Sequence, residues 1–175
     1  MREDTIPTLF YGRVKEMGDE VAMRQKIYGI WEDISWKEYG EKVREVACGL
    51  IELGLEKGDC VSVIGENCPD WLYTDMGTMC AGGVSVGIYT TNSSEEVQYV
   101  LQNSRSKFYI VENEEQLDKA LEVRPNLPDL IKIIVIDMEG LRNFHDAMVM
   151  SFEELLEIGR ERDKRDPDLF EFKLN

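Results

Sequence analysis

The segment from Cys60 to Ile136 alternates short apolar runs with amphipathic stretches, and this alternation constrains the fold more than any other feature of the chain. The apolar runs have the length and the Val and Ile content of buried strands: Cys60–Ile64, Val84–Ile88, Lys107–Val111 and Leu130–Ile136. Helical patterns separate them: one starts at Asn67 and Pro69 and runs to the double glycine Gly82-Gly83, and two others span residues 94–103 and 114–123. A β-α-β-α-β-α-β order of this kind predicts an α/β fold with a mainly parallel sheet covered by helices on both faces.

Residues 79–97 show how one such unit is built. The adjacent glycines Gly82 and Gly83 allow a helix end and the next strand to approach closely, because neither residue carries a Cβ. A polar loop, Tyr89–Asn92, follows the strand. Ser93 or Ser94 is then expected to cap a new helix whose first turn is acidic, which suits the helix dipole.

The region before this sheet predicts a helix and a β-hairpin. Apolar positions between Ile6 and Met17 recur at helical spacing. Two runs of β-formers, Val21–Ile27 and Ile30–Trp36, flank Tyr28-Gly29 and indicate a hairpin. Ser35 and Glu38 form a capping box, which predicts the start of a long amphipathic helix that ends at Gly54.

The far end of the chain contains one more predicted helix. Ser151 and Glu154 repeat the capping box before Phe152, Leu155 and neighbouring apolar residues. The segment from Arg160 to Asp168 is highly charged and contains Pro167, so we expect residues 160–175 to be a linker that leaves the domain. With 175 residues and no internal repeat, residues 1–175 are interpreted as part of one domain.

The net charge of −15 excludes several classes of function. Nucleic-acid binding needs an excess of Lys and Arg, and so does electrostatic docking to anionic lipid. No signal peptide or apolar run of about 20 residues is found, so we expect a cytoplasmic protein without a transmembrane segment. The four cysteines, which are Cys48, Cys60, Cys68 and Cys80, are predicted to be reduced core residues rather than metal ligands, and His145 is expected at the surface.

Self-contained catalytic motifs are not found in this sequence. A dinucleotide fingerprint and a phosphate-binding P-loop are both missing. The hydroxyl-rich segment 90–94 could present donors to a phosphate, but a helix cap preceded by a polar loop explains the same residues. The residues alone therefore predict an acidic α/β domain, with no catalytic residue and no metal site assigned.

Four short motifs go further because they follow the order of a known family: Trp36-Lys37-Glu38-Tyr39, Gly54–Asp59, Glu66–Trp71, and Ala81–Val84 leading to Tyr89-Thr90-Thr91. In this order the chain resembles the opening of the AMP-forming acyl-CoA synthetases of the adenylate-forming superfamily, with the long-chain fatty acid branch the most similar. The resemblance implies the partial N-terminal domain of an adenylate-forming enzyme.

The resemblance also implies a function for the parent protein. Such a ligase uses ATP and Mg²⁺ to convert a fatty acid to acyl-AMP, and then transfers the acyl group to CoA. The family's phosphate-binding loop, catalytic lysine and ribose-binding aspartate are not found here, and the chain stops at Asn175, near where that loop would begin. We therefore expect the opening quarter to third of an enzyme, with the remainder of the ligase as its partner. Alone, it is expected to be inactive and to bind no cofactor.

Carried over from relatives, the loop residues Tyr89, Thr90 and Thr91 and the helix residue Lys119 are expected on the CoA side of the active site. Short-chain relatives have glycines in the loop and two arginines on the helix, so this chain departs from their pattern. The alternative is that the threonines lead into a capped helix and Lys119 faces solvent.

Two other classes of function remain open. One is a stand-alone interaction or regulatory module with an adenylate-former-like fold, and the other is a small doubly wound nucleotide-binding protein. The sequence also leaves the acyl chain length and the oligomeric state open.

Overall fold

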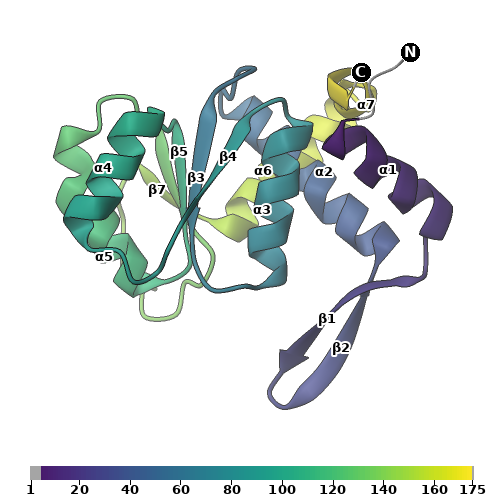
Figure 1. The fold of residues 1–175 in the computed structure, drawn as a ribbon, viewed down its shortest axis with the longest axis horizontal. Coiled ribbons are helices and arrows are strands. Elements are labelled where there is room, and N and C mark those ends of the chain that lie inside the picture. The colour runs from purple at the N-terminus through teal and green to yellow at the C-terminus, as the bar shows by residue number, and fades with distance from the viewer. Residues whose placement is uncertain (1–4, 175) are drawn as a thin grey trace.

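A parallel β-sheet lies between two helical layers in the computed structural model, which describes residues 5–174 (Figure 1). The sheet has the strand order β4-β3-β5-β6-β7, and every neighbouring pair is parallel. Its strands are β3 (Cys60–Ile64), β4 (Val84–Ile88), β5 (Phe108–Val111), β6 (Lys132–Val135) and β7 (Val149–Ser151). The predicted α/β alternation is confirmed. The strand β7 was not predicted, because it is only three residues long and no helix precedes it.

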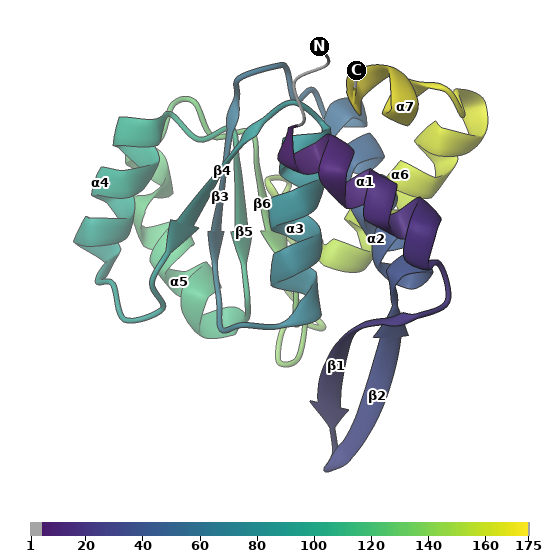
Figure 2. The ribbon, with the colours of Figure 1, turned by 45° about the vertical axis from the view of Figure 1, so that its right-hand side comes forward.

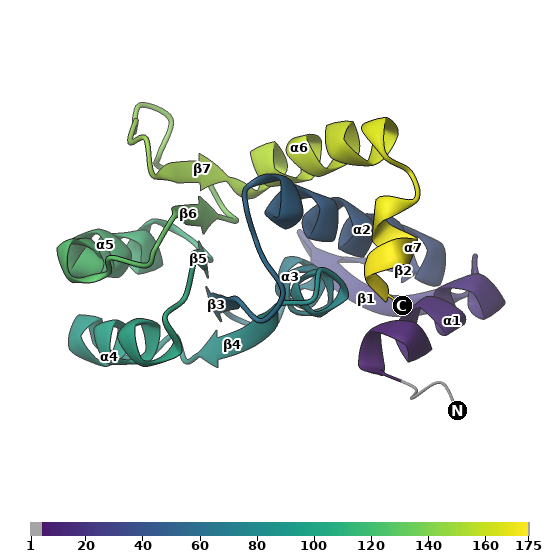
Figure 3. The same ribbon diagram turned by 90° about the horizontal axis from the view of Figure 1, so that it is seen from above.

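Helices cover both faces of the sheet, as the view along the strands shows (Figure 3). One layer contains α2 (Trp36–Glu52), α3 (Pro69–Cys80) and α6 (Phe152–Arg165), and the other contains α4 (Ser94–Ser104) and α5 (Glu114–Val123). Strand side chains alternate between the two layers. Val61 and Val63 belong to the core under α2, α3 and α6, whereas the next residue, Ile64, belongs to the core under α4 and α5. The three inner strands β3, β5 and β6 are therefore buried on both sides, which explains their continuous apolar sequence, whereas the edge strands β4 and β7 are partly exposed.

Serine caps fix where three of these helices begin. Ser35, Ser93 and Ser151 each form a complete capping box with the Glu three residues later. Helix α3 differs from the prediction that Asn67 lies at its start: Cys68 is the N-cap residue and makes no side-chain capping bond. Pro69 occupies the first turn, where its missing N–H costs nothing, so proline rather than a polar cap defines this helix start.

The N-terminal helix and hairpin have the predicted positions. Helix α1 spans Ile6–Met17, and the antiparallel pair β1 (Val21–Ile27) and β2 (Ile30–Ser35) projects away from the sheet (Figure 2). Phe10 of α1 packs edge-on against Tyr39 of α2, with ring centroids 4.7 Å apart. The helix thus extends the core of one layer, whereas the hairpin tip around Tyr28 is exposed.

The C-terminal segment differs from the expected linker. Helix α6 continues to Arg165, and a second helix, α7 (Leu169–Leu174), follows. Phe170 is 1% exposed and belongs to the core of the α2 layer. The charges that suggested a solvated linker are instead paired across helices: Asp163 of α6 contacts Arg44 of α2 at 2.7 Å. Residues 160–174 are therefore packed against the domain, whatever follows them in a longer protein.

Candidate ligand site at the carboxyl end of the sheet

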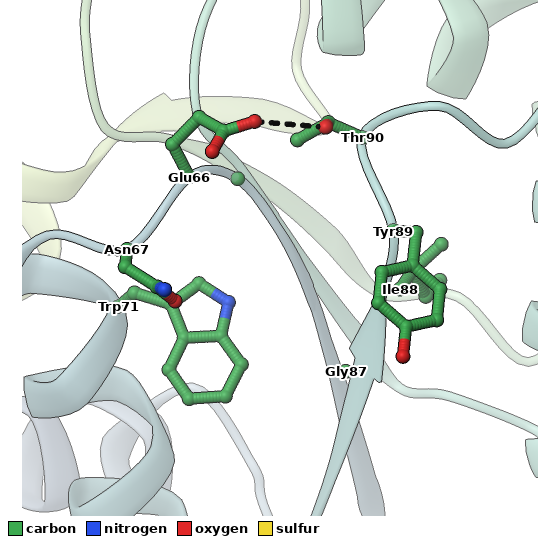
Figure 4. A pocket seen from close by; sticks show the side chains of 8 residues that line it. Glu66, Asn67, Trp71, Gly87, Ile88, Tyr89 and Thr90 are labelled. Carbon is green, nitrogen blue, oxygen red and sulfur yellow. Dashed lines mark hydrogen bonds between the residues drawn. The ribbon is translucent and has the colours of Figure 1, made fainter.

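Polar side chains from three chain segments converge where β3 and β4 end. They border a cavity of about 370 Å³ that is lined by Gly65, Glu66, Asn67, Trp71, Gly87, Ile88, Tyr89 and Thr90 (Figure 4). The chain passes from β3 to β4 on one side and later returns to β5 on the other side of β3. In open α/β sheets, loops at the carboxyl ends near such a reversal are the usual place for a ligand.

The loop after β3 is fixed by a carboxylate from the loop after β5. Glu112 Oε2 accepts a hydrogen bond of 3.0 Å from the backbone N–H of Glu66. Gly65 permits this approach, because a Cβ at that position would lie 3.1 Å from the Cβ of Glu112. The Glu112 backbone is itself bonded on both sides, since its N–H donates to Ile64 O and its carbonyl accepts from Asp137 N–H. The loop after β5 thus holds the loop after β3 through an anchored carboxylate.

The loop after β4 is held at two atoms of Thr90. Its hydroxyl donates to Glu66 Oε1 at 3.0 Å (Figure 4). Its carbonyl accepts from Lys119 Nζ at 2.8 Å. The Lys119 side chain is 18% exposed and turns toward the loop, so it does not extend freely into solvent. Glu115, one helical turn earlier, lies 3.7 Å from the same ammonium group. Two of the predicted site residues, Thr90 and Lys119, are therefore brought into direct contact.

The other two predicted residues lie at the margin. Tyr89 is 82% exposed, and Figure 4 shows its ring on the opposite side of the cavity from Trp71. Thr91 is exposed. Ser93 caps α4 by accepting a hydrogen bond from the Glu96 N–H, so the helix start already has its own partner. The segment 90–94 is therefore a polar loop that leads into a capped helix, and Thr90 is its residue at the cavity.

The sequence motifs do not include Glu112, and they include Glu66 without indicating a role for it. Glu112 directly follows β5, and Glu66 comes two residues after the end of β3. That position was the available signal, because the carboxyl ends of parallel strands lie at one edge. The pattern did not indicate which of the glutamates near strand ends would bind a neighbouring loop.

None of the four cysteines belongs to the residues that line this cavity. Cys48 and Cys80 are buried as predicted, and burial raises their thiol pKa values to about 11 and about 12. Cys60 and Cys68 are partly exposed, which differs from the prediction of full burial. His145 is exposed, as predicted.

Across residues 5–174, no group of three or more His, Cys, Asp and Glu side chains is placed to hold a metal ion. Within that same range, no helix combines the length and apolar character needed to cross a membrane.

Comparison with known proteins defines the class. A family model described as AMP-binding enzyme matches residues 10–167, and the chain therefore belongs to the AMP-binding enzyme family. It is 39% identical over 157 residues to a long-chain-fatty-acid–CoA ligase of Xenopus laevis, and 35% identical over 157 residues to one of Rattus norvegicus. Each alignment covers 90% of this chain.

Solved structures of adenylate-forming enzymes share the fold. The A-PCP didomain of a carboxylic acid reductase from Segniliparus rugosus superposes with a TM-score of 0.79 at 18% identity, over 91% of this chain and 27% of that one. The anthranilate CoA ligase AuaEII gives a TM-score of 0.74 at 22% identity, over 86% of this chain and 26% of that one. The chain spans 21% of the Xenopus relative and 22% of the rat relative, somewhat less than the expected quarter to third.

Proposed function

We propose that this chain is the N-terminal part of an ATP-dependent, AMP-forming ligase that joins a long-chain fatty acid to CoA. Its identity of 35–39% to long-chain-fatty-acid–CoA ligases over 90% of its length carries the proposal. In that enzyme ATP and Mg²⁺ supply the activation of the carboxylate, and CoA accepts the acyl group. We place the ligase in the cytoplasm, as the sequence predicts.

Within the ligase, this segment has a structural task. Its sheet and helical layers present the loops after β3, β4 and β5 at one edge, where the remainder of the ligase is expected to complete the active site. Its own polar groups at that edge are bonded to one another in one network, in which the Thr90 hydroxyl donates to Glu66 and Lys119 donates to the Thr90 carbonyl. We therefore propose that the segment alone neither forms acyl-AMP nor binds ATP or CoA tightly.

The proposed contact with CoA is the loop Tyr89–Thr91 together with Lys119. Lys119 supplies a positive charge next to the loop, and a lysine can face a phosphate as a point charge. The fit is limited, because the Glu115 carboxylate lies 3.7 Å from the same ammonium group and the Glu66 carboxylate binds the same loop residue, Thr90. We propose that Lys119 faces one phosphate of CoA at the rim, with Tyr89, Thr90 and Thr91 as the adjoining loop. The Glu112 carboxylate, which occupies the Glu66 N–H, also weighs against a phosphate at the loop after β3, as a doubly wound nucleotide-binding protein would require.

The test is the substitution Lys119→Ala in the complete ligase that carries this segment. The Michaelis constant for CoA should rise about tenfold, because one charge-assisted contact with a phosphate is lost. Fatty-acid-dependent exchange of pyrophosphate into ATP, which reports adenylation without CoA, should be unchanged.

Asp118→Ala is the matched control, because Asp118 is the exposed neighbour of Lys119 on α5. It changes the local charge by one unit without removing the cation. A CoA dependence that Lys119→Ala leaves unchanged would overturn the assignment of this loop to CoA.

A further inference from the structure

The loop Tyr89–Asn92 is held by two tethers of different kinds, and both end on Thr90. One is the bond from its hydroxyl to the Glu66 carboxylate, and the other is the bond from Lys119 to its carbonyl. Inside the loop, the Asn92 N–H donates to Tyr89 O at 3.0 Å and closes a turn. The position of the loop therefore depends on residues of two other segments.

The two tethers differ in what can replace them. A ligand anion would compete with the Thr90 carbonyl for Lys119, because an ammonium group binds a charged oxygen more strongly than a neutral one. For the Thr90 hydroxyl such an anion offers no stronger acceptor, because this hydroxyl already donates to a carboxylate. The Glu66 tether is thus retained when Lys119 turns to a ligand.

Glu66 is well placed for this task because its own backbone is fixed. Its N–H is bonded to Glu112, whose backbone is bonded to the ends of two segments of the sheet edge, at Ile64 and Asp137. The rigid sheet is thereby connected to the loop through Glu112, then Glu66, then Thr90. Hydrogen bonds that a carboxylate accepts are stronger than bonds between two neutral groups.

We infer that Glu66 is the positioning residue of the loop Tyr89–Asn92, and that Glu112 holds Glu66 in place for it. Lys119 has a different role: its ammonium group binds the Thr90 carbonyl in the free chain and a ligand anion when one is present. We call the bonds from Glu112 to Glu66 and from Glu66 to Thr90 the clamp. Its role in CoA binding rests on the proposed function, whereas the bonds themselves are a property of this chain.

The clamp is tested without any ligand, by measuring hydrogen exchange of the Asn92 amide by NMR in the 175-residue chain. Glu66→Ala removes the acceptor for Thr90, and the amide should exchange about tenfold faster. Glu66→Gln retains a side-chain oxygen that can accept the bond, so exchange should return to within about twofold of the unsubstituted chain. Asp118→Ala, which removes a nearby charge but no tether, should leave it unchanged. Equal exchange in Glu66→Ala and the unsubstituted chain, in samples whose spectra show the same fold, would overturn the inference.

A second measurement links the clamp to the ligase. In the complete enzyme, Glu66→Ala should raise the Michaelis constant for CoA several-fold with adenylation unchanged, and Glu66→Gln should restore it. If Lys119→Ala has no effect on CoA while Glu66→Ala still accelerates Asn92 exchange, the CoA assignment fails and the clamp stands. If Lys119→Ala weakens CoA binding while Asn92 exchange is unaffected by Glu66→Ala, the clamp fails and the CoA assignment stands.

Discussion

The helical layer on one face of the sheet and the loops at its carboxyl edge are held together in opposite ways. In the layer, backbones touch: a Cβ on Gly49 of α2 would lie 2.6 Å from the Leu155 carbonyl of α6, and Gly159 of α6 packs against the Glu45 backbone of α2. At the edge, a few hydrogen bonds through Glu112, Glu66 and Thr90 fix the loops beside an open cavity.

This difference separates stability from function. Close helix packing leaves no room for an added methyl group, so a substitution there affects the whole fold. The edge has space and polar bonds that can be exchanged, so a substitution there should change local motion and binding while the fold persists. A segment with this division suits a scaffold that presents loops to the rest of an enzyme.

The largest effect is expected at the contact between α2 and α6. Gly159→Ala would place a methyl group inside the space of the Glu45 carbonyl, and the two backbones would have to separate. We expect a loss of more than about 4 kcal/mol in the free energy of unfolding, measured by urea denaturation, or no folded protein at all. Gly12→Ala is the matched control, because Gly12 lies in α1 with no atom within 4 Å of an added Cβ. That change should be neutral or stabilise by about 0.5–1 kcal/mol. Similar losses for both variants would contradict the close packing.

The next effect concerns the C-terminal helix α7. Phe170 is almost fully buried, and Tyr11 of α1 meets its ring edge-on with centroids 5.5 Å apart. Phe170→Ala should therefore cost about 3 kcal/mol of unfolding free energy. A true linker would show no change, so an unaffected urea midpoint would restore the original expectation for residues 160–175.

A smaller effect is expected at the site. Gly65→Ala would bring a methyl group to 3.1 Å from the Glu112 Cβ, a contact that a shift of a few tenths of an ångström relieves. We expect about 1 kcal/mol of destabilisation or less, together with faster exchange of the Asn92 amide. A loss as large as that of Gly159→Ala would remove the proposed distinction between the two regions.

The reactivity of the cysteines tests the tight packing of the core without any substitution. A thiolate is the reactive form, and burial raises the pKa of Cys48 to about 11 and of Cys80 to about 12. Burial also raises the pKa of Cys60, but this residue is partly exposed. At pH 8 iodoacetamide should therefore modify Cys60 before the buried pair, as mass spectrometry of timed samples would show. Its rate should rise with pH as more thiolate forms. Equal rates at Cys60 and Cys80 in the folded protein would contradict the tight core.

Sequence patterns predicted the elements whose signals are local. The capping boxes at Ser35 and Ser151, and the apolar strands between residues 60 and 136, were recognisable because cap chemistry and burial on both faces leave direct traces in the residues. The short strand β7 was missed because three half-buried residues have no distinctive pattern.

The linker expectation shows what local patterns lack. The charges from Arg160 onward predict a linker, but several pair with residues of α2 more than a hundred positions earlier, as Arg162 does with Glu52. The site has the same limit. Thr90 and Lys119 were predicted from the family resemblance, whereas Glu112 acts through a partner 46 positions away in the chain. Long-range pairs of this kind follow from topology and not from spacing.

The central claim is that this chain provides scaffold and a loop for a ligase but not the adenylation chemistry. It is tested most directly by measuring fatty-acid-dependent pyrophosphate release from ATP and Mg²⁺, with the 175-residue chain and with a complete ligase that carries it. The account predicts release by the complete enzyme and none above background by the chain alone. Pyrophosphate release by the isolated chain that depends on fatty acid would contradict it, and so would a complete ligase that is inactive toward every long-chain fatty acid.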